Sequence, residues 1–363
     1  MTTLVLKVVN RCNIDCDYCY VFHGADQDWR HLPARMSIDV ARATARRIAE
    51  HANAHQLDRV DIALHGGEPL LAGPRHLEEL LHAIDEHLGP VAQISLQTNG
   101  TLINDRWLDL FDRYEVRVGV SLDGPPAAND RHRLTHRGHS SADAATRGIR
   151  LLRTRPTRFA GILAVVDLRN DPIAVFDYLT GLGPPVIDFN LPHATHDQPP
   201  YRTDTGQPEY GQWLSRVYDR WITNTSEAGT SVRILEDIIA LSLGGTSAVE
   251  SLGLVPSGIA VIESDGAIED TDTLKASSPT ASQLGLNVFD HTLDDAAHHP
   301  VIRTRRHGAA SLAAACRRCP LVSICGGGHL PHRQSIARGY DNPSVYCHDL
   351  THLIRHIHTT LPA

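Results

Sequence analysis

The sequence has 363 residues, of which 42% are hydrophobic and 21% charged, and a formal net charge of −8. This length and composition suit one large α/β domain, alone or with an appendage. No basic run indicates a nucleic-acid partner, and no apolar stretch of about 18 residues indicates a membrane span. Seven cysteines in two clusters do not suit a disulfide scaffold, and the N-terminus lacks a signal-peptide pattern. We therefore expect a cytoplasmic protein with neither nucleic acid nor membrane as partner.

Strands and helices alternate along the first half of the chain. The apolar and amphipathic patterns predict six β-then-α repeats, which imply a parallel sheet with right-handed crossovers, open or closed into a partial barrel. Ligands bind such sheets at the C-terminal ends of the strands. We expect the first helix, which is rich in Ala and Arg, to be solvated. The expected strands are 4–9, 61–64, 92–97, 117–121, 159–165 and 186–190, and the expected helices are 38–51, 76–87, 104–113, 142–153 and 172–181.

The pattern changes in the second half. Residues 199–208 are rich in Pro, Asp and Thr and are predicted to be a linker, followed by helices at 209–224 and 234–243. Beyond residue 253 the chain predicts short strands and turns, including a hairpin of 259–262 and 267–270. We therefore expect three parts, which are 1–198, a linker with bridging helices at 199–252, and 253–363.

Three cysteines lie close together just after the first predicted strand. Cys12, Cys16 and Cys19 have the spacing C-x3-C-x2-C, with Tyr18 before the last of them. Three thiolates on one loop can hold three irons of a [4Fe–4S] cluster and leave the fourth iron open for a substrate or cofactor. The alternative is a zinc site, which would need a fourth ligand such as His23.

Polar turns follow the next three predicted strands. Gly66-Gly67-Glu68 gives a flexible backbone and an acceptor for an ammonium group. A serine and an arginine after the fourth strand suit a carboxylate or ribose hydroxyls. Each turn alone also fits an ordinary loop, but their order behind the cysteine loop is hard to assign to chance.

In this combination the first ~190 residues resemble the radical S-adenosylmethionine enzymes, and their length suits six βα units. The resemblance implies a partial (β/α)6 TIM-like barrel. It also implies S-adenosylmethionine bound to the open iron and a 5′-deoxyadenosyl radical that takes hydrogen from the substrate. The cofactor contacts that it implies are Gly66, Gly67, Glu68, Thr98, Asn99, Ser121, Arg133 and Val165.

The C-terminal part resembles the SPASM extension of this superfamily. Its cysteine run is present, but the hairpin carries no cysteine and His329 stands where a further cysteine is usual. The resemblance implies that the ligands of one auxiliary cluster are kept and those of its neighbour are lost, so we expect two [4Fe–4S] clusters in all. A zinc knuckle is the alternative for the four retained cysteines. These are Cys316, Cys319, Cys325 and Cys347.

Segments 64–71, 191–196, 326–333 and 341–347 further resemble the FxsB branch of SPASM enzymes. That resemblance implies modification of a ribosomally made precursor peptide by oxidative, cyclophane-type side-chain crosslinking. It also implies a reductant such as a flavodoxin or ferredoxin. Because no leader-gripping N-terminal region is evident, leader recognition would use the barrel, the C-terminal region or a separate protein. The alternatives are a sulfatase-maturase-like oxidase, a peptide epimerase and, outside enzymes, a metal-binding scaffold.

The sequence does not single out the group that accepts the substrate proton. Four candidates lie near predicted strand ends, and each also fits a structural role. They are Asp123, Asp188, His193 and His196.

Overall fold

The structure is a computed structural model that describes residues 1–247, 249–255, 258–305 and 308–361. The chain forms two compact units that interleave along the sequence. The predicted division at residues 198 and 252 stays a prediction. No helix within the described ranges is both long and apolar enough to cross a membrane. The first unit consists of Met1–Leu122, Asn129–Gly161 and Gly258–Arg303, and the second of Asp123–Ala128, Ile162–Ser257 and Thr304–Ala363.

The first unit is built on a sheet whose central strand is β1. This strand pairs in parallel with β2 on one side and with β8 on the other, and β3 and β4 continue the parallel pairing beyond β2. The predicted hairpin is confirmed as the antiparallel pair β8–β9, and it joins the same sheet as the N-terminal strand. In order across the sheet the strands are β10 (Gln283–Asn287), β9 (Ala267–Glu269), β8 (Ile259–Ile262), β1 (Thr3–Val9), β2 (Val60–Gly66), β3 (Ala92–Thr98) and β4 (Arg117–Ser121).

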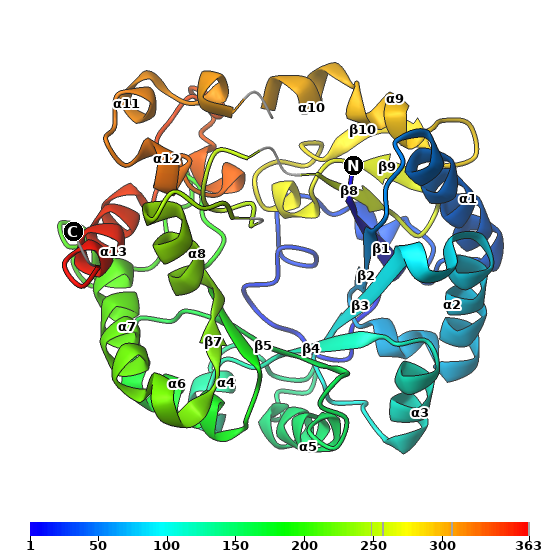
Figure 1. Cartoon of the computed structure of the whole chain (residues 1–363), viewed down its shortest axis with the longest axis horizontal. Helices are drawn as coiled ribbons and strands as arrows, with labels where there is room; N and C mark the ends of the chain where they lie inside the picture. The colour runs from blue at the N-terminus through cyan, green and yellow to red at the C-terminus, as the bar shows by residue number, and fades with distance from the viewer. Residues whose placement is uncertain (248, 256–257, 306–307, 362–363) are drawn as a thin grey trace. The chain divides into compact units, whose positions relative to one another are not determined.

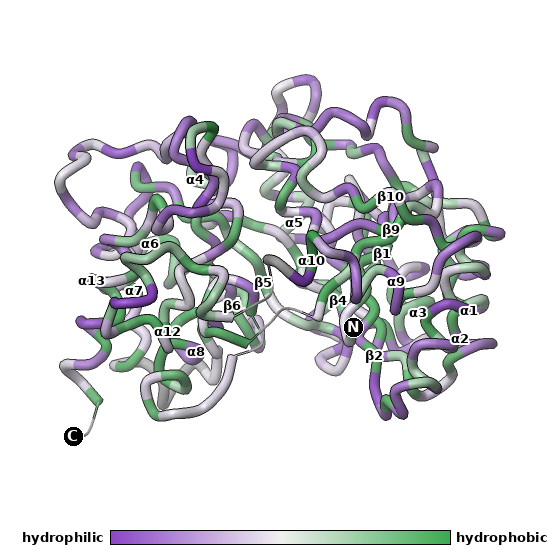
Figure 2. Tube along the Cα trace, turned by 90° about the horizontal axis from the view of Figure 1, so that it is seen from above, coloured by the Kyte–Doolittle hydropathy of each residue, from purple (hydrophilic) through white to green (hydrophobic). Residues whose placement is uncertain are grey.

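Amphipathic helices cover this sheet, and α1, α2 and α3 lie along the outside of β1–β4 (Figure 1). The side chain of Ser37 caps α1 by accepting a hydrogen bond from the N–H of Val40. The prediction that this helix is solvated is wrong, because one face, including Val40, Ala45 and Ile48, is buried. Hydrophilic and hydrophobic residues accordingly mix along the traces of α1 and α2 (Figure 2). The helices of this unit include α1 (Ile38–Ala54), α2 (Pro74–Leu88), α3 (Asp105–Arg113), α5 (Ala142–Leu152) and α9 (Leu293–Ala297).

The second unit continues the βα alternation. From Ile162 onward β5 pairs in parallel with β6, and β6 pairs in parallel with the short strand β7, which the sequence did not predict. The segment 199–208 is more than a linker, because the half-buried Arg202 forms an ion pair with Asp349. The elements of this unit include β5 (Phe159–Val165), β6 (Val186–Asn190), β7 (Ser231–Val232), α6 (Pro172–Gly181), α7 (Glu209–Ala228), α8 (Arg233–Ser242), α11 (Ala314–Arg317), α12 (Val322–Cys325) and α13 (Cys347–His358).

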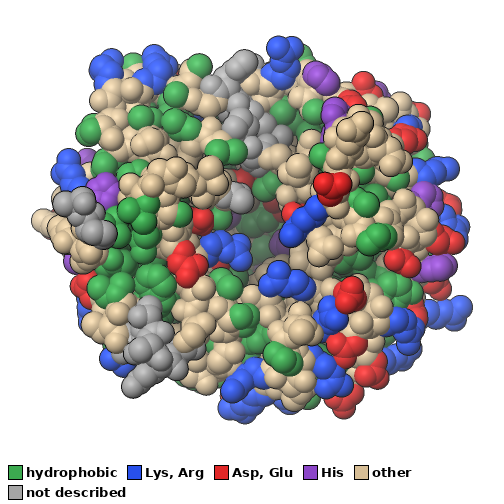
Figure 3. All heavy atoms as spheres, viewed as in Figure 1, with side chains coloured by type: hydrophobic (Ala, Val, Ile, Leu, Met, Phe, Trp, Pro, Cys, Tyr) green, Lys and Arg blue, Asp and Glu red, His purple; other side chains and the backbone are tan. Residues whose placement is uncertain are grey.

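Acidic and basic side chains are interspersed over helices α2 and α3 on the face drawn in Figure 3. Two of the pairs involved are Arg113 with Glu78 and Arg75 with Glu79. Such exposed pairs stabilise a fold by at most about 1 kcal/mol each. Such pairs are ordinary surface features and do not mark a functional site.

Candidate functional site

Three thiols lie on the loop that follows β1. Burial is the main cause that raises the pKa of Cys12, to about 11, and burial also raises the pKa of Cys19. The two thiols lie close enough that the charge of Cys19 raises the pKa of Cys12 further. Thiols of this kind stay protonated at neutral pH until a metal displaces the proton. The loop is therefore suited to a metal centre rather than to free thiolates.

A single zinc ion at this loop would need closely spaced thiolates and a fourth ligand. In the described part of the chain, the groups of three ligand atoms that lie within 4.8 Å of one another consist of histidine and aspartate, without cysteine. Thiolates on one tetrahedral zinc lie about 3.8 Å apart, given a Zn–S bond of about 2.3 Å. Thiolates that bind different irons of one cluster are spread more widely. His23, the alternative fourth zinc ligand, has its Nε2 atom 2.8 Å from Asp15 Oδ1.

Arg133 and the segment around it contact the cysteine loop. The loop is tied to the segment around Arg133 by a hydrogen bond from Asp15 N–H to the carbonyl oxygen of Leu134, at 2.7 Å. The Arg133 guanidinium is buried and donates to Tyr18 Oη at 2.8 Å. Its charge lowers the pKa of Cys12 and of Cys19. A fixed cation therefore lies beside the thiols, where a cluster and an anionic ligand would both be negative.

The glycines at the end of β2 allow close approach to the cysteine loop. A Cβ on Gly66, whose φ is +145°, would lie 2.1 Å from the Val9 carbonyl oxygen. A Cβ on Gly67 would lie 2.3 Å from the Arg11 carbonyl oxygen. Gly67 N–H donates to the Val9 oxygen at 2.7 Å, so this amide already has a partner in the protein. Contacts of this turn with a ligand ammonium would use its oxygen atoms.

Glu68 is fully buried and holds the next turn in place. Its carboxylate accepts hydrogen bonds from Thr98 Oγ1 at 2.7 Å, from Asn99 N–H at 2.7 Å and from Leu70 N–H at 3.0 Å. Burial raises its pKa, although these three donors act against the rise. The side-chain Nδ2 atom of Asn99 donates a hydrogen bond to Cys12 Sγ, at a distance of 3.8 Å. Five of the sequence-predicted cofactor residues, Gly66, Gly67, Glu68, Thr98 and Asn99, thus meet at the cysteine loop.

Apart from Arg133, which lies beside the cysteine loop, the two other predicted cofactor residues are Ser121 and Val165 at strand ends. Ser121 Oγ accepts a hydrogen bond from Gln97 Nε2 at 2.8 Å, which links β4 to β3. In the second unit, Val165 N–H donates to Asp123 Oδ1 at 3.0 Å. Asp123 is buried, so this bond gives it a structural role at the end of β5. Its role as proton acceptor stays a prediction.

A buried polar cluster beside the cysteine loop was not predicted from the sequence. Lys7 on β1 pairs with Asp272, which also accepts a hydrogen bond from Tyr20 Oη at 2.7 Å. Lys7 Nζ lies 3.2 Å from His65 Nδ1, and its charge lowers the pKa of Cys19. The only sequence signal was a lysine inside the apolar strand. Asp272, in a 3-10 helix (Asp272–Ala276) after β9, carried no signal.

Charge pairing outweighs burial at Asp272. Burial alone raises the pKa of this carboxyl, but the charges of Lys7 and His65 and the hydrogen bonds from Lys7 and Tyr20 bring it below its ordinary value. Burial and, after it, the charge of the Lys7 ammonium lower the pKa of His65 to about 4. At neutral pH the cluster therefore contains an ionised Lys7–Asp272 pair and a neutral imidazole.

Removing one partner of this pair is expected to destabilise the fold. Lys7→Met leaves a buried carboxylate without its cation, which should lower the free energy of unfolding by about 3–5 kcal/mol at pH 7. Since the pKa of Asp272 is depressed in the native state, its contribution is present above the unfolded value of about 4 and is lost as pH falls below it. The loss measured by urea unfolding should therefore shrink at acid pH.

The matched control is the double variant Lys7→Met with Asp272→Asn, in which neither charge remains. It should recover at least half of the stability lost in Lys7→Met, because the buried uncompensated charge is gone. A loss below about 0.5 kcal/mol in the single variant would contradict a buried charge pair at this position.

Four further thiols gather in the second unit. The charges of Cys316, Cys319 and Cys347 each raise the pKa of Cys325, although burial is the main cause of its rise to about 12. Three of these cysteines come from two short helices, α11 and α12, or the turn between them, and Cys347 begins α13. The four thiols therefore form one group built from two distant segments.

A buried arginine beside these thiols fits an anionic cluster. Burial lowers the pKa of Arg333, and the charges of Cys316 and Cys325 counteract this. Its Nε and Nη1 atoms are buried without a hydrogen-bond partner in the described structure. Such atoms are costly to bury unsatisfied. A [4Fe–4S] cluster held by four thiolates carries net negative charge and sulfur acceptors, so the donor set and the arginine together suit it.

The other proton-acceptor candidates have identifiable neighbours. Asp188 on β6 is mostly buried and lies 3.3 Å from Arg233 Nη1. His196 Nε2 lies 2.9 Å from the carbonyl oxygen of Pro343. His193 lies against His329 and His332, with ring centroids 5.8 and 6.0 Å away. The structure thus separates these three residues into different local environments, and their catalytic roles stay predictions.

Comparison with known proteins identifies the first part of the chain. Residues 6–167 match the family model of the Radical SAM superfamily. Over 328 residues the chain is 28% identical to the serine-type anaerobic sulfatase-maturating enzyme of Klebsiella aerogenes, with 88% of this chain and 77% of that protein covered.

Solved structures extend the likeness to nearly the whole chain. Native anSMEcpe with bound AdoMet matches with a TM-score of 0.84 and 22% identity, covering 98% of this chain and 97% of that one. Streptococcus suis SuiB bound to precursor peptide SuiA matches with a TM-score of 0.64 and 16% identity, covering 95% and 75%. The predicted fold class is confirmed as an α/β radical SAM partial barrel with a C-terminal cysteine-containing region. The chain is therefore similar to the Radical SAM superfamily over residues 6–167 and to anaerobic sulfatase-maturating enzymes over most of its length.

Proposed function

We propose that the protein oxidises a ribosomally made peptide by linking two of its side chains, a cyclophane-type crosslink. The observation that carries this proposal is the group of four cysteines beside Arg333. A cluster held by four thiolates has no open iron, so it suits electron transfer rather than ligation of a substrate. A second electron carrier is needed for a net oxidation and is superfluous for a redox-neutral rearrangement.

The two groups of cysteines would hold two clusters with different roles. Cys12, Cys16 and Cys19 would hold the cluster that binds S-adenosylmethionine, and the strand-end turns from Gly66 to Asn99 would surround the cofactor. When bound there, the cluster and S-adenosylmethionine together supply the chemistry that abstracts a hydrogen atom from an unactivated C–H bond. Forming a crosslink removes one further electron and one proton, so the peptide loses two hydrogens in total. The four cysteines of the second unit would hold the centre that takes that electron.

The proton needs an acceptor within the protein. Asp272 joins the four earlier candidates, because it is an ionised carboxylate beside the cysteine loop and is hydrogen-bonded to Tyr20. Lys7 would act as a positioning residue that keeps this carboxylate ionised.

The partner we propose is a precursor peptide. The likeness to a protein solved with its precursor peptide supports this class of substrate. A one-electron reductant such as a flavodoxin or ferredoxin would reduce the first cluster. Leader recognition would use this chain or a separate leader-binding protein.

A second candidate is oxidation of a single cysteine or serine in a protein substrate. It is favoured by the 28% identity to the Klebsiella sulfatase-maturating enzyme. A peptide epimerase on the same scaffold is a third alternative. The three products can be told apart by mass together with fragmentation.

The test is mass spectrometry of a peptide encoded beside this gene, after incubation with reconstituted protein, S-adenosylmethionine and dithionite. We expect a product lighter by two hydrogens that resists fragmentation between two residues, formed with about one 5′-deoxyadenosine per event. The same mass loss without blocked fragmentation, and with a reactive aldehyde, would favour oxidation of a serine. A mass that is unchanged in ordinary water but increases through deuterium uptake in heavy water would favour epimerisation and contradict the crosslink.

A further inference from the structure

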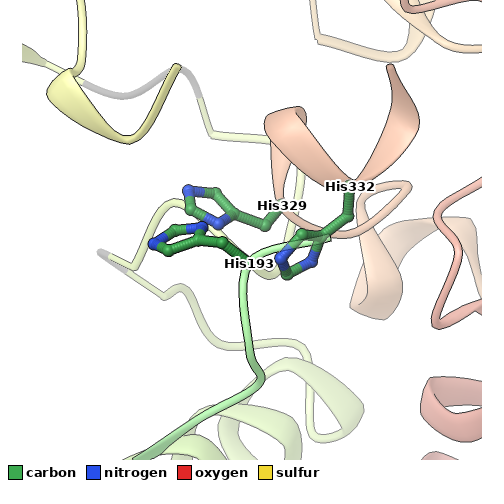
Figure 4. A group of neighbouring side chains, drawn as sticks. All are labelled: His193, His329 and His332. Carbon is green, nitrogen blue, oxygen red and sulfur yellow. The ribbon is translucent and has the colours of Figure 1, made fainter. Parts of the chain in front are cut away.

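Three histidines of the second unit converge on one point (Figure 4). His193 follows β6, whereas His329 and His332 lie at a 3-10 helix (Leu330–Arg333). One ring nitrogen from each lies within 4.8 Å of the other two. His332 is buried, and the side chain of His329 is only 14% exposed. The group is distinct from the seven cysteines, and a metal bound there would remove His193 from the candidates for the proton acceptor.

The convergence is held by the surrounding backbone. Tyr346 Oη donates to the carbonyl oxygen of Pro192 at 2.8 Å, immediately before His193. His196 N–H donates to the carbonyl oxygen of Gln334 at 2.9 Å, immediately beyond the 3-10 helix. The Tyr346 ring also lies edge-on to His332, with centroids 4.8 Å apart. The two segments are therefore fixed to each other on both sides of the histidines, and their imidazoles are prepositioned.

One buried ring nitrogen of this group has no hydrogen-bond partner among the described residues. The Nε2 atom of His332 is buried, and no hydrogen bond reaches it from any described residue. Leaving such an atom unsatisfied is unfavourable, because its desolvation is not compensated. A carboxylate oxygen of Glu250 lies 3.9 Å from His329 Nε2 at the edge of the group. Three imidazoles with a nearby carboxylate form a donor set of nitrogen and oxygen.

We propose that His193, His329 and His332 bind one divalent transition-metal ion of the zinc type. Three imidazole ligands leave a fourth position, which Glu250 or a water molecule would fill. The ion would tie the segment after β6 to the 3-10 helix that follows the cysteine run. This inference does not depend on the proposed peptide chemistry, because it concerns side chains that the chemistry does not use as ligands.

The test uses full-length protein reconstituted with iron and sulfide, then incubated with Zn²⁺ alone and desalted. We expect about one zinc per chain. X-ray absorption spectra at the zinc edge should show Zn–N or Zn–O distances of about 2.0 Å and no Zn–S distance of about 2.3 Å. His193→Ala and His329→Ala should each lower retained zinc by at least tenfold with iron content unchanged. His196→Ala, in the same segment, should retain the zinc.

Three results would overturn the proposal. They are wild-type protein that retains no zinc, zinc bound through sulfur, and zinc retained by both histidine variants. Loss of iron along with zinc in folded variants, judged by circular dichroism, would instead make the histidines ligands of an iron–sulfur cluster. The wild-type spectrum is decisive even if one variant fails to fold.

Discussion

Replacing Cys16 with alanine is expected to abolish reductive cleavage of S-adenosylmethionine. The cysteine loop then offers only Cys12 and Cys19, and two thiolates cannot retain a cluster that needs three. Cys16 is 9% exposed, so water does not readily replace the lost ligand. Residues that act as a unit lose nearly all activity when one is removed, so we expect a fall on the order of 10³-fold or more. The measurement is 5′-deoxyadenosine formed from dithionite-reduced, reconstituted protein.

A neighbouring loop residue provides the control. Asp17 carries a largely exposed carboxylate that pairs with His132 Nδ1. Asp17→Asn changes the charge of the loop and keeps all three thiols, so it should cleave S-adenosylmethionine at near the wild-type rate. Full cleavage by Cys16→Ala would show that this loop is not the catalytic site. Iron content should fall by about four per chain in Cys16→Ala and stay unchanged in the control.

Replacing Cys347 with alanine separates the two centres. The second cluster would be opened or lost, whereas Cys12, Cys16 and Cys19 are untouched. If the second centre accepts the substrate electron, 5′-deoxyadenosine formation persists as an uncoupled reaction and modified peptide disappears. We expect at least a hundredfold loss of product, with cleavage of S-adenosylmethionine falling less than about tenfold.

The fold around Cys347 should survive this change. Asp349, two residues later, accepts hydrogen bonds from Tyr210 N–H at 2.9 Å and Gly211 N–H at 3.1 Å, and it pairs with Arg202. These contacts fix the start of α13 independently of the cysteine. A purely structural cluster predicts the opposite outcome, with insoluble protein or both activities lost together.

The exposed neighbour His348 supplies the control for this variant. His348→Ala retains every thiol and should make product at the normal rate. A folded Cys347→Ala variant that still makes crosslinked peptide at that rate would refute both the electron-acceptor role and the argument for a net oxidation.

The local elements of this fold could be predicted because their patterns are local. Strands such as β4 and β5 have the predicted bounds, since a short apolar run marks each of them. The cysteine loop and the Gly66-Gly67-Glu68 turn were visible because residue type and spacing express the chemistry directly. Prediction failed where burial depends on a distant partner. The helix α1 was expected to be solvated, but several of its alanine side chains are buried on one face of the helix.

Contacts between distant segments had no sequence signal. The Lys7–Asp272 pair joins residues 265 positions apart, and only the lysine inside an apolar strand hinted at a partner. The pairing of β8 beside β1 likewise depends on tertiary structure, because nothing in either strand specifies its neighbour. The three-histidine group was invisible for the same reason, since His193 and the 3-10 helix that carries His332 are far apart in the chain.

The central claim is that the chain carries one S-adenosylmethionine-binding cluster and one auxiliary cluster. The most direct measurement is iron and acid-labile sulfide in anaerobically reconstituted protein, normalised to amino-acid analysis. The three and four cysteines predict about eight irons and eight sulfides per chain. About four of each would show that one cysteine group holds no cubane. About twelve would show a third cluster, held by ligands such as His329 or residues near Asp270, and either result would contradict the claim.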